Sequence, residues 1–318
     1  MENKPRVSII IPTYNGEQYL FETLSSVYAQ TFKDWQAVIV VDGSTDETLS
    51  RFEKSVFSED SRFRIISQQN MGVSRARNVG LDLCESDYVA FLDHDDIWHP
   101  TKLERQFRFL EENRTFLACT CWYLTSKKVE GGYSHSKLFS YQSFDSMMGN
   151  WISFSGNGPA LASSLLMRRN DDELRFSDEY NAIGDLDFIS RLLLVGRVAV
   201  IKTPLMLYVQ HKNQMHMRGN LISDYVNFYA NIHESTVRQF RLNRKNLNAK
   251  VNAHLNLIRV VSSLSKKPNI RTCFRLIFSR EIWNLTLLTL IVSMIRKRVA
   301  GYFARVRYGG MIKALWNT

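Results

Sequence analysis

Short apolar runs rich in β-branched residues alternate with more polar segments along the first 110 residues of the chain. Four of these runs predict strands, at residues 7–11, 35–41, 63–67 and 88–92. The segments between and after them predict helices, near residues 20–30, 45–52, 74–83 and 103–110. Strands and helices that alternate at this spacing predict an α/β fold, with a mostly parallel sheet and helices on both of its faces.

A cluster of carboxylates follows the fourth predicted strand. Asp93-His94-Asp95-Asp96 comes directly after the run 88–92, at the strand end where α/β proteins place ligands. Three carboxylates so close together repel one another unless a cation compensates them, which favours a hard divalent metal. The alternative is a solvated acidic turn before the helix that starts near Pro100.

The later part of the chain is less regular. Glycine, serine and asparagine are frequent in residues 120–180, which indicates loops over a pocket. After Val209 the pattern becomes helical and basic, without a clear strand. We therefore predict one α/β domain over residues 1–215 and a helical basic extension over residues 216–318.

The charge of the chain is unevenly distributed. From Lys212 to the end there are 19 Lys and Arg but three acidic residues, about +16, which leaves about −6 for the rest of a total of +10. Residues 282–295 carry no charge but are too few to span a membrane, and Arg296-Lys297-Arg298 follows them. This mixture predicts a helix that docks on an anionic membrane surface, with a core helix as the alternative. Nucleic acid is not expected, since no recognised binding module accompanies the charge.

Several ordered motifs carry a resemblance to a known family. They are VSIIIPTYNG at 7–16, VDGSTD at 41–46, NMGVSRARN at 70–78, FLDHDD at 91–96, GDLDFISRL at 184–192 and YVQH at 208–211. Together they resemble the family 2 glycosyltransferases, which have the GT-A fold and act by inversion. The resemblance covers roughly residues 5–215, and the four ordered motifs in about the first 100 residues are far more specific than a single Asp-x-Asp.

The resemblance implies a nucleotide site at the carboxyl ends of the strands. Its residues would be Pro12, Thr13 and Tyr14 against the base, Asp42 hydrogen-bonded to the base, Arg75 and Arg77 near the diphosphate or ribose, and Asp93 at the ribose. From the residues alone, Asp42 could instead form an Asx turn, and the two arginines could be surface charges.

The resemblance also implies a metal site and a catalytic base. Asp95 would bind a divalent cation, Mn²⁺ or Mg²⁺, and His211 is a second candidate ligand. Asp96 would support the acceptor side or the metal shell, and Asp185 would be the base. Trp151 is a candidate for stacking on a sugar.

The chain departs from the family pattern at two of these positions. The family usually has Glu-Asp where this chain has Gly184 before Asp185, which leaves Asp187 as an alternative base or a helix N-terminal charge. His211 lacks the arginine that usually precedes it, so it could also be an ordinary histidine at a strand end.

These features predict an inverting, metal-dependent glycosyltransferase with a UDP-sugar donor and a glycan acceptor, lipid-linked, at the cytoplasmic face of a bacterial membrane. The acceptor hydroxyl needs a base, and the leaving diphosphate needs a cation. One rival is a sugar nucleotidyltransferase, which would need a Gly-rich loop with a basic residue after the first strand. The other is a non-catalytic membrane-bound scaffold, which would not need the carboxylates.

Overall fold

The first 112 residues fold as the alternation predicts. In the computed structural model, strands and helices alternate in the order β1 (Val7–Thr13), α1 (Leu20–Tyr28), β2 (Trp35–Asp42), α2 (Thr48–Glu53), β3 (Phe63–Gln68), α3 (Val73–Asp82), β4 (Tyr88–Phe91) and α4 (Lys102–Glu112). The structure describes residues 4–130, 132–134, 136–143, 162–169, 174–180 and 183–211, together with Asp224 and Phe228. Each predicted element is present, and its ends differ from the prediction by a few residues.

The sheet is parallel in its first part and mixed in its second. A short strand, β5 (Ile97–Trp98), lies between β4 and α4. The later elements are β6 (Phe116–Val129), β7 (Gly132–Tyr133), β8 (Lys137–Phe139), the 3₁₀ turn η1 (Ala162–Ser164), β9 (Leu166–Arg168), α6 (Gly184–Val195) and β10 (Arg197–Gln210). The strand order is β3-β2-β1-β4-β9-β6-β10-β5, and the first four strands are parallel. β9 and β5 run antiparallel to their neighbours. Strands of two or three residues are too short to show a periodic pattern, so the sequence did not predict them.

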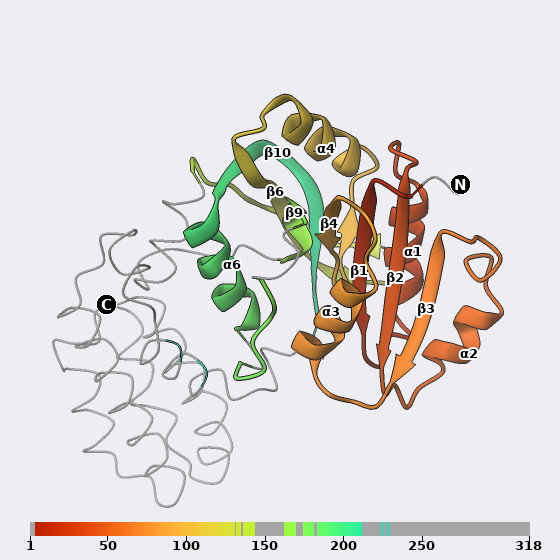
Figure 1. The fold of residues 1–318 in the computed structure, drawn as a ribbon. Coiled ribbons are helices and arrows are strands. Elements are labelled where there is room, and N and C mark those ends of the chain that lie inside the picture. Colours follow the sequence, from red (N-terminus) through yellow and green to blue (C-terminus); the bar gives the residue numbers. More distant parts are fainter. Residues whose placement is uncertain are drawn as a thin grey trace, which may run out of the picture. The chain divides into compact units, whose positions relative to one another are not determined.

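The two faces of β1 pack against different helices. Ile9 and Ile11 belong to the same buried cluster as Leu20 of α1. Ile10 points to the opposite face, where a Cβ on Gly80 of α3 would lie 2.4 Å from its Cγ2 atom. Because side chains alternate across a strand, α1 and α3 cover opposite faces of the sheet (Figure 1). Glycine at position 80 therefore lets α3 approach β1 closely.

A lysine at the start of α4 is buried, and no sequence pattern predicts its burial. Lys102, the first residue of α4, is fully buried. Its Nζ donates to Gln106 Oε1 at 2.6 Å and lies 4.0 Å from the centroid of the Trp98 ring. Burial lowers the pKa of the Lys102 ammonium to about 8, because the charged form loses its hydration.

This burial predicts how stability depends on pH. Between pH 8 and 10.5 the unfolded chain keeps the Lys102 proton and the folded chain does not, so raising the pH stabilises the fold. The contribution is about 1.4 kcal/mol per pH unit in that window. Relative to Lys102→Met, the wild type should therefore gain stability from pH 8 to 10.5, as measured by urea unfolding. A difference between the two proteins that stays constant over this range would contradict the burial of a titrating amine.

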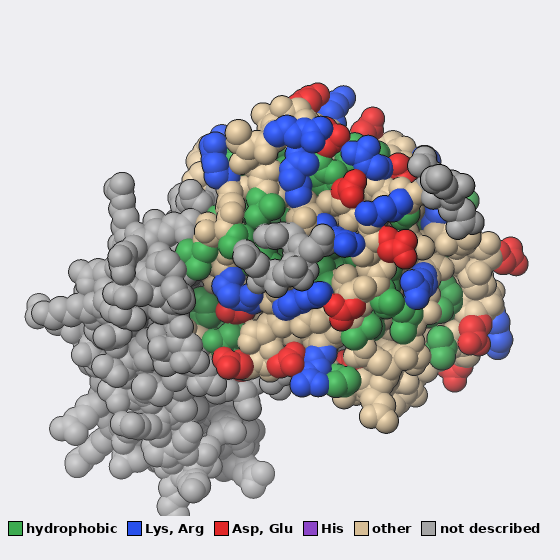
Figure 2. Space-filling view, viewed as in Figure 1, with side chains coloured by type: hydrophobic (Ala, Val, Ile, Leu, Met, Phe, Trp, Pro, Cys, Tyr) green, Lys and Arg blue, Asp and Glu red, His purple; other side chains and the backbone are tan. Residues whose placement is uncertain are grey.

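The predicted extension lies beyond most of the described residues. Residues 216–318 are described at Asp224 and Phe228 alone, so the boundary near 215 and the extension stay predictions. Within the part that the structure describes, no helix is long and apolar enough to cross a membrane. Figure 2 shows basic and acidic side chains interspersed on the described part of the face in view. On that face, the net negative charge of the first domain does not gather into one patch.

Candidate active site

The loops after β1 and β2 are tied to each other at the carboxyl edge of the sheet. The backbone N–H of Asn15 donates to Ser44 Oγ at 3.0 Å, and Asn15 has a φ of 49°, a left-handed conformation that asparagine tolerates. Pro12 and Thr13 are buried in β1, whereas Tyr14 is 41% exposed. Of the three predicted base contacts, Tyr14 has the side chain most open to a ligand.

Asp42, the last residue of β2, holds the loop that leads into α3. Its Oδ1 accepts from Gln68 Nε2 at 2.7 Å and from the Met71 N–H at 2.8 Å, and its Oδ2 accepts from the Gly72 N–H at 2.8 Å. The side chain thus has a structural role, although the partners differ from those of a local Asx turn. The predicted contact with a base stays a prediction, and Oδ2 keeps a lone pair with which to make it.

Arg77 of α3 joins two of the predicted site carboxylates. Its Nη1 lies 2.6 Å from Asp185 Oδ1, and its Nη2 lies 2.7 Å from Asp93 Oδ1. The guanidinium is buried and lies 4.9 Å from the centroid of the Phe176 ring. Burial alone lowers the pKa of Arg77, but the charges of Asp185 and Asp93 outweigh it and raise that pKa above its ordinary value. Arg77 is therefore a permanent cation that holds the two carboxylates together.

Asp185 and Asp187 point to different partners, although both lie in the first turn of α6. Asp185 faces Arg77, and its Oδ2 accepts from the Ala162 N–H at 3.2 Å. Asp187 Oδ2 instead accepts from Arg191 on its own helix, at 2.6 Å from Nη2. At 3.6 residues per turn, positions two apart lie about 200° apart around a helix. Asp185, and not Asp187, therefore lies in the cluster with Arg77 and Asp93, and its role as the base stays a prediction.

Asp95 and His211 meet, although 116 positions separate them. His211 Nε2 lies 2.7 Å from Asp95 Oδ2, and both side chains are largely buried. Burial alone raises the pKa of Asp95, but the hydrogen bond from His211 and the nearby histidines His94 and His211 lower it below its ordinary value. In this arrangement the carboxylate is therefore ionised and accepts from His211, and a bound cation would replace that hydrogen bond.

The donor set of Asp95 and His211 fits a divalent cation whose other ligands come from elsewhere. Adjacent ligands of an octahedral cation lie about 3 Å apart, which is close to the observed separation of 2.7 Å. Within the described residues there is no group of three or more His, Cys, Asp and Glu side chains that could hold a metal. The two side chains would therefore hold a cation together with phosphate and water oxygens, and an imidazole ligand suits Mn²⁺ better than Mg²⁺.

Asp96 is buried behind this pair. It is fully buried, its Oδ1 accepts from the Val209 N–H at 3.4 Å, and its Oδ2 has no hydrogen-bond partner among the described residues. Burial, with the charges of Asp95 and Asp93, raises the pKa of Asp96 well above its ordinary value. Both predicted roles of Asp96, at the metal shell or on the acceptor side, stay predictions.

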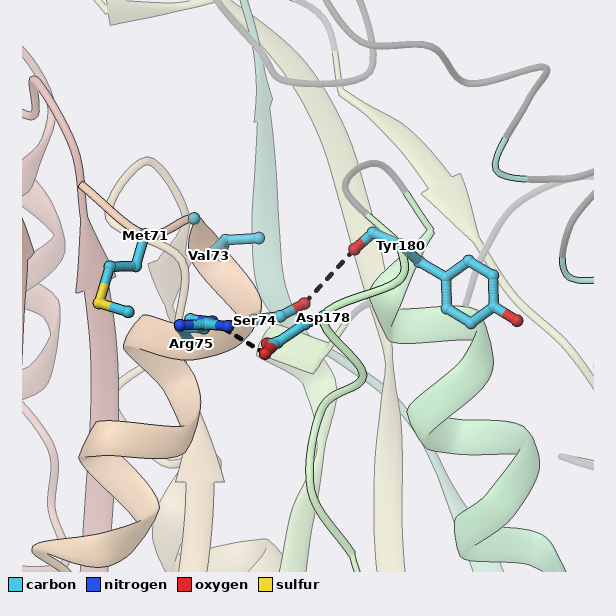
Figure 3. A pocket seen from close by; sticks show the side chains of 7 residues that line it. Met71, Val73, Ser74, Arg75, Asp178 and Tyr180 are labelled. Atoms are coloured by element: carbon cyan, nitrogen blue, oxygen red, sulfur yellow. Dashed lines mark hydrogen bonds and ion pairs between the residues drawn. The ribbon is translucent and has the colours of Figure 1, made fainter.

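Arg75 lies apart from Arg77, at the mouth of a cavity of about 310 Å³. Its Nε donates to Asp178 Oδ2 at 2.8 Å, and both side chains are about half exposed. Figure 3 shows this pair, together with Met71 and Tyr180, around the start of α3. The arrangement suits the predicted contact with a phosphate or ribose, because the exposed guanidinium of Arg75 can leave Asp178 and bind an oxygen of the ligand instead.

Ser163 and Asp178 contact predicted site residues but were not themselves predicted. Ser163 Oγ accepts from the Asp93 N–H at 3.1 Å, and Asp178 pairs with Arg75. Neither residue stands in a motif or in a periodic segment, so no signal in a single sequence marks them. Trp151, the candidate for sugar stacking, lies outside the described residues.

Comparisons with known proteins identify the family. The profile of "Glycosyl transferase family 2" matches residues 8–175, which is more than half of the chain. The chain belongs to this family and is a glycosyltransferase. It is 29% identical over 279 residues to an uncharacterized glycosyltransferase of Haemophilus influenzae, covering 83% of this chain and 80% of that protein.

A second relative matches over a shorter stretch. The putative teichuronic acid biosynthesis glycosyltransferase TuaG of Bacillus subtilis is 38% identical over 128 residues. The match covers 39% of this chain and 49% of TuaG. The likeness to TuaG is thus limited to about half of that protein.

Solved structures confirm the α/β fold of GT-A type. S. aureus TarS residues 1–349, in complex with UDP-GlcNAc, superposes with a TM-score of 0.60 at 22% identity, over 92% of this chain and 85% of that one. The mannosyltransferase PcManGT from Pyrobaculum calidifontis, in complex with GDP-Man and Mn²⁺, has a TM-score of 0.55 at 17% identity. That match covers 93% of this chain and 87% of PcManGT.

Proposed function

We propose that this glycosyltransferase moves a sugar from a nucleotide-diphosphate donor to a hydroxyl group of a glycan, by a single displacement with inversion. The observation that carries the proposal is the meeting of Asp93, Arg77 and Asp185 beside the Asp95–His211 pair. These side chains come from the ends of β4 and β10, from α3 and from α6, so the fold gathers them at one edge of the sheet.

Each group has a separate task in this reaction. Asp185 takes the proton of the acceptor hydroxyl as that oxygen attacks the anomeric carbon. Arg77 keeps Asp185 and Asp93 at a fixed separation, so that the base and the donor ribose are positioned together. Asp95 and His211 would hold a divalent cation, which would supply charge stabilisation to the leaving diphosphate. Attack by one hydroxyl, without a covalent enzyme intermediate, inverts the anomeric carbon.

The donor that we propose is a UDP-sugar. Support comes from Tyr14, whose side chain is exposed directly after β1, and from Asp42, which ends the neighbouring strand β2. TarS, which shares the fold, was solved with UDP-GlcNAc, and PcManGT with GDP-Man and Mn²⁺. Release of UDP or GDP from a panel of nucleotide sugars, with and without Mn²⁺, tests the donor and the metal together.

The metal assignment predicts the behaviour of Asp95→Ala. This variant should lose the gain in UDP affinity that Mn²⁺ gives to the wild type, because the cation loses its carboxylate ligand. Loss of a residue that supports a metal ligand usually weakens metal binding by about 10- to 100-fold. Loss of the ligand Asp95 itself is expected to weaken it by at least as much. Titration calorimetry with UDP, with and without Mn²⁺, measures it. Binding of UDP that depends on Mn²⁺ as strongly in Asp95→Ala as in the wild type would remove Asp95 from the metal site.

Neither rival hypothesis gains support from this arrangement. A non-catalytic scaffold does not need a carboxylate such as Asp185 next to Asp93, the predicted contact of the donor ribose. A nucleotidyltransferase needs a Gly-rich loop with a basic residue after β1. The residues after β1 are Tyr14, Asn15, Gly16 and Glu17, with no lysine or arginine among them.

We further propose that the acceptor is lipid-linked and that the enzyme works peripherally on the cytoplasmic face of a bacterial membrane. Support comes from the basic sequence after residue 212 and from the uncharged run 282–295 before Arg296-Lys297-Arg298. Each of these three cations should contribute about 1 kcal/mol to binding of anionic vesicles. Replacing all three by glutamine should release the protein from such vesicles at moderate salt in a sedimentation assay. Vesicle binding that is insensitive to salt and to these changes would contradict the proposal.

A further inference from the structure

His211 comes directly after the last residue of β10, so its side chain is positioned by contacts and not by the strand ladder. The last residue of β10 in register with β6 is Gln210, which pairs with Lys127. Beyond this point, an imidazole can turn about two side-chain bonds unless its surroundings fix it. Among the contacts that fix the ring are Asp95 at its edge and the ring of Tyr19 on its face.

Tyr19 forms a flat support for the histidine. The centroids of the two rings lie 4.2 Å apart and their planes are inclined by 19°, which is a stacked geometry. Tyr19 immediately precedes α1, and its backbone N–H donates to the Gly16 carbonyl at 3.0 Å. A Cβ on Gly16 would lie 2.8 Å from Thr13 Cγ2, so this turn is closely packed against the end of β1.

A second set of contacts holds the Tyr19 ring in place. Lys128, near the end of β6, has its Nζ 5.4 Å from the centroid of the Tyr19 ring. Glu22, one helical turn after Tyr19, accepts from Lys128 Nζ at 2.7 Å and from the hydroxyl of Tyr133. The β6–β7 hairpin is thereby fastened to α1 with Tyr19 beside the lysine, an arrangement that a cation–π attraction stabilises.

We propose that Tyr19 is a positioning residue that sets the orientation of His211 for metal binding, and that Glu22 and Lys128 keep Tyr19 in place. The inference rests on the proposed function, in which His211 and Asp95 share a cation. A ligand whose ring orientation is set before the cation arrives loses less conformational freedom on binding, so the support raises metal affinity without touching the metal.

The test measures metal affinity directly, with Mn²⁺ titrated into the full chain in the presence of UDP. Tyr19→Leu, which removes the ring, is expected to weaken Mn²⁺ binding by about 10- to 100-fold, the usual cost of losing a partner behind a metal ligand. Tyr19→Phe keeps the stacked ring and should stay within about twofold of the wild type, which makes it the matched control. Urea unfolding of both variants checks that the fold is retained.

A double-mutant comparison separates positioning from a general structural effect. In a His211→Ala background, Tyr19→Leu should weaken Mn²⁺ binding no further, because the ligand that it orients is absent. Equal losses with and without His211, or Mn²⁺ binding by Tyr19→Leu as tight as that of the wild type, would overturn the inference while leaving the proposed function intact. A wild type that shows no Mn²⁺ binding with UDP would overturn both.

Discussion

Asp185→Asn is expected to lower kcat by about 10²- to 10⁴-fold, the range that general base catalysis usually contributes. Asparagine keeps the size of the side chain and an oxygen that can accept from Arg77, which Asp185 contacts at 2.6 Å. It cannot take up the proton of the acceptor hydroxyl. Donor binding should therefore change little, and the loss should appear in kcat. Steady-state kinetics at saturating donor, together with calorimetric titration of UDP, separates the two effects.

Asp187→Asn is the matched control for this prediction. Asp187 lies in the same helical turn and has a similar acidic side chain, but it pairs with Arg191 and not with Arg77. The substitution weakens an ion pair within α6 and leaves the Asp185–Arg77–Asp93 cluster unchanged. Its effect on kcat should be less than about tenfold, as expected for a group that takes no part in proton transfer. A larger loss in Asp187→Asn than in Asp185→Asn would place the base two positions later.

The sequence predicts which residues gather at the site better than it predicts their partners. Asp42 ends β2 and Asp93 follows β4, and β1 lies between these two strands in the sheet. Because the carboxyl ends of parallel strands lie at one edge, residues that follow strands come together whatever their side-chain contacts. The predicted location of the site follows from this rule, and the predicted fold follows from the alternation of strands and helices.

The partners depend on long-range geometry that local patterns do not contain. Arg77 and Asp185 are 108 positions apart, and their contact requires α6 to return beside α3. Asp95 and His211 meet because β5 pairs with β10 in one particular register, with Trp98 opposite Met206. β5 has two residues and no periodic signal, so a single sequence does not predict this register. The burial of Lys102 and Asp96 was also not predicted, because charged residues are rarely fully buried.

Arg77→Met is expected to lower the free energy of unfolding by about 3 kcal/mol, near the lower end of the usual cost of removing one partner from a buried ion pair. Methionine has a similar length and can pack against Phe176, which Arg77 contacts at 4.9 Å. It leaves Asp93 and Asp185 without the cation that joins them. Both carboxylates are partly exposed, so water replaces some of the lost interaction and the cost stays below the upper end of the range. Urea unfolding near neutral pH measures the change.

Arg75→Gln is the control for the loss of an arginine from the same helix. Its ion pair with Asp178 is about half exposed on both sides, so its removal should change stability by less than about 1 kcal/mol. The defect of Arg77→Met should also shrink as the pH is lowered, because burial raises the pKa of Asp93 and the unpaired carboxyl group then takes up a proton and no longer needs a cation. If Arg77→Met were no less stable than Arg75→Gln near neutral pH, the guanidinium would not hold the two carboxylates together. The base would then need another group to position it beside the donor.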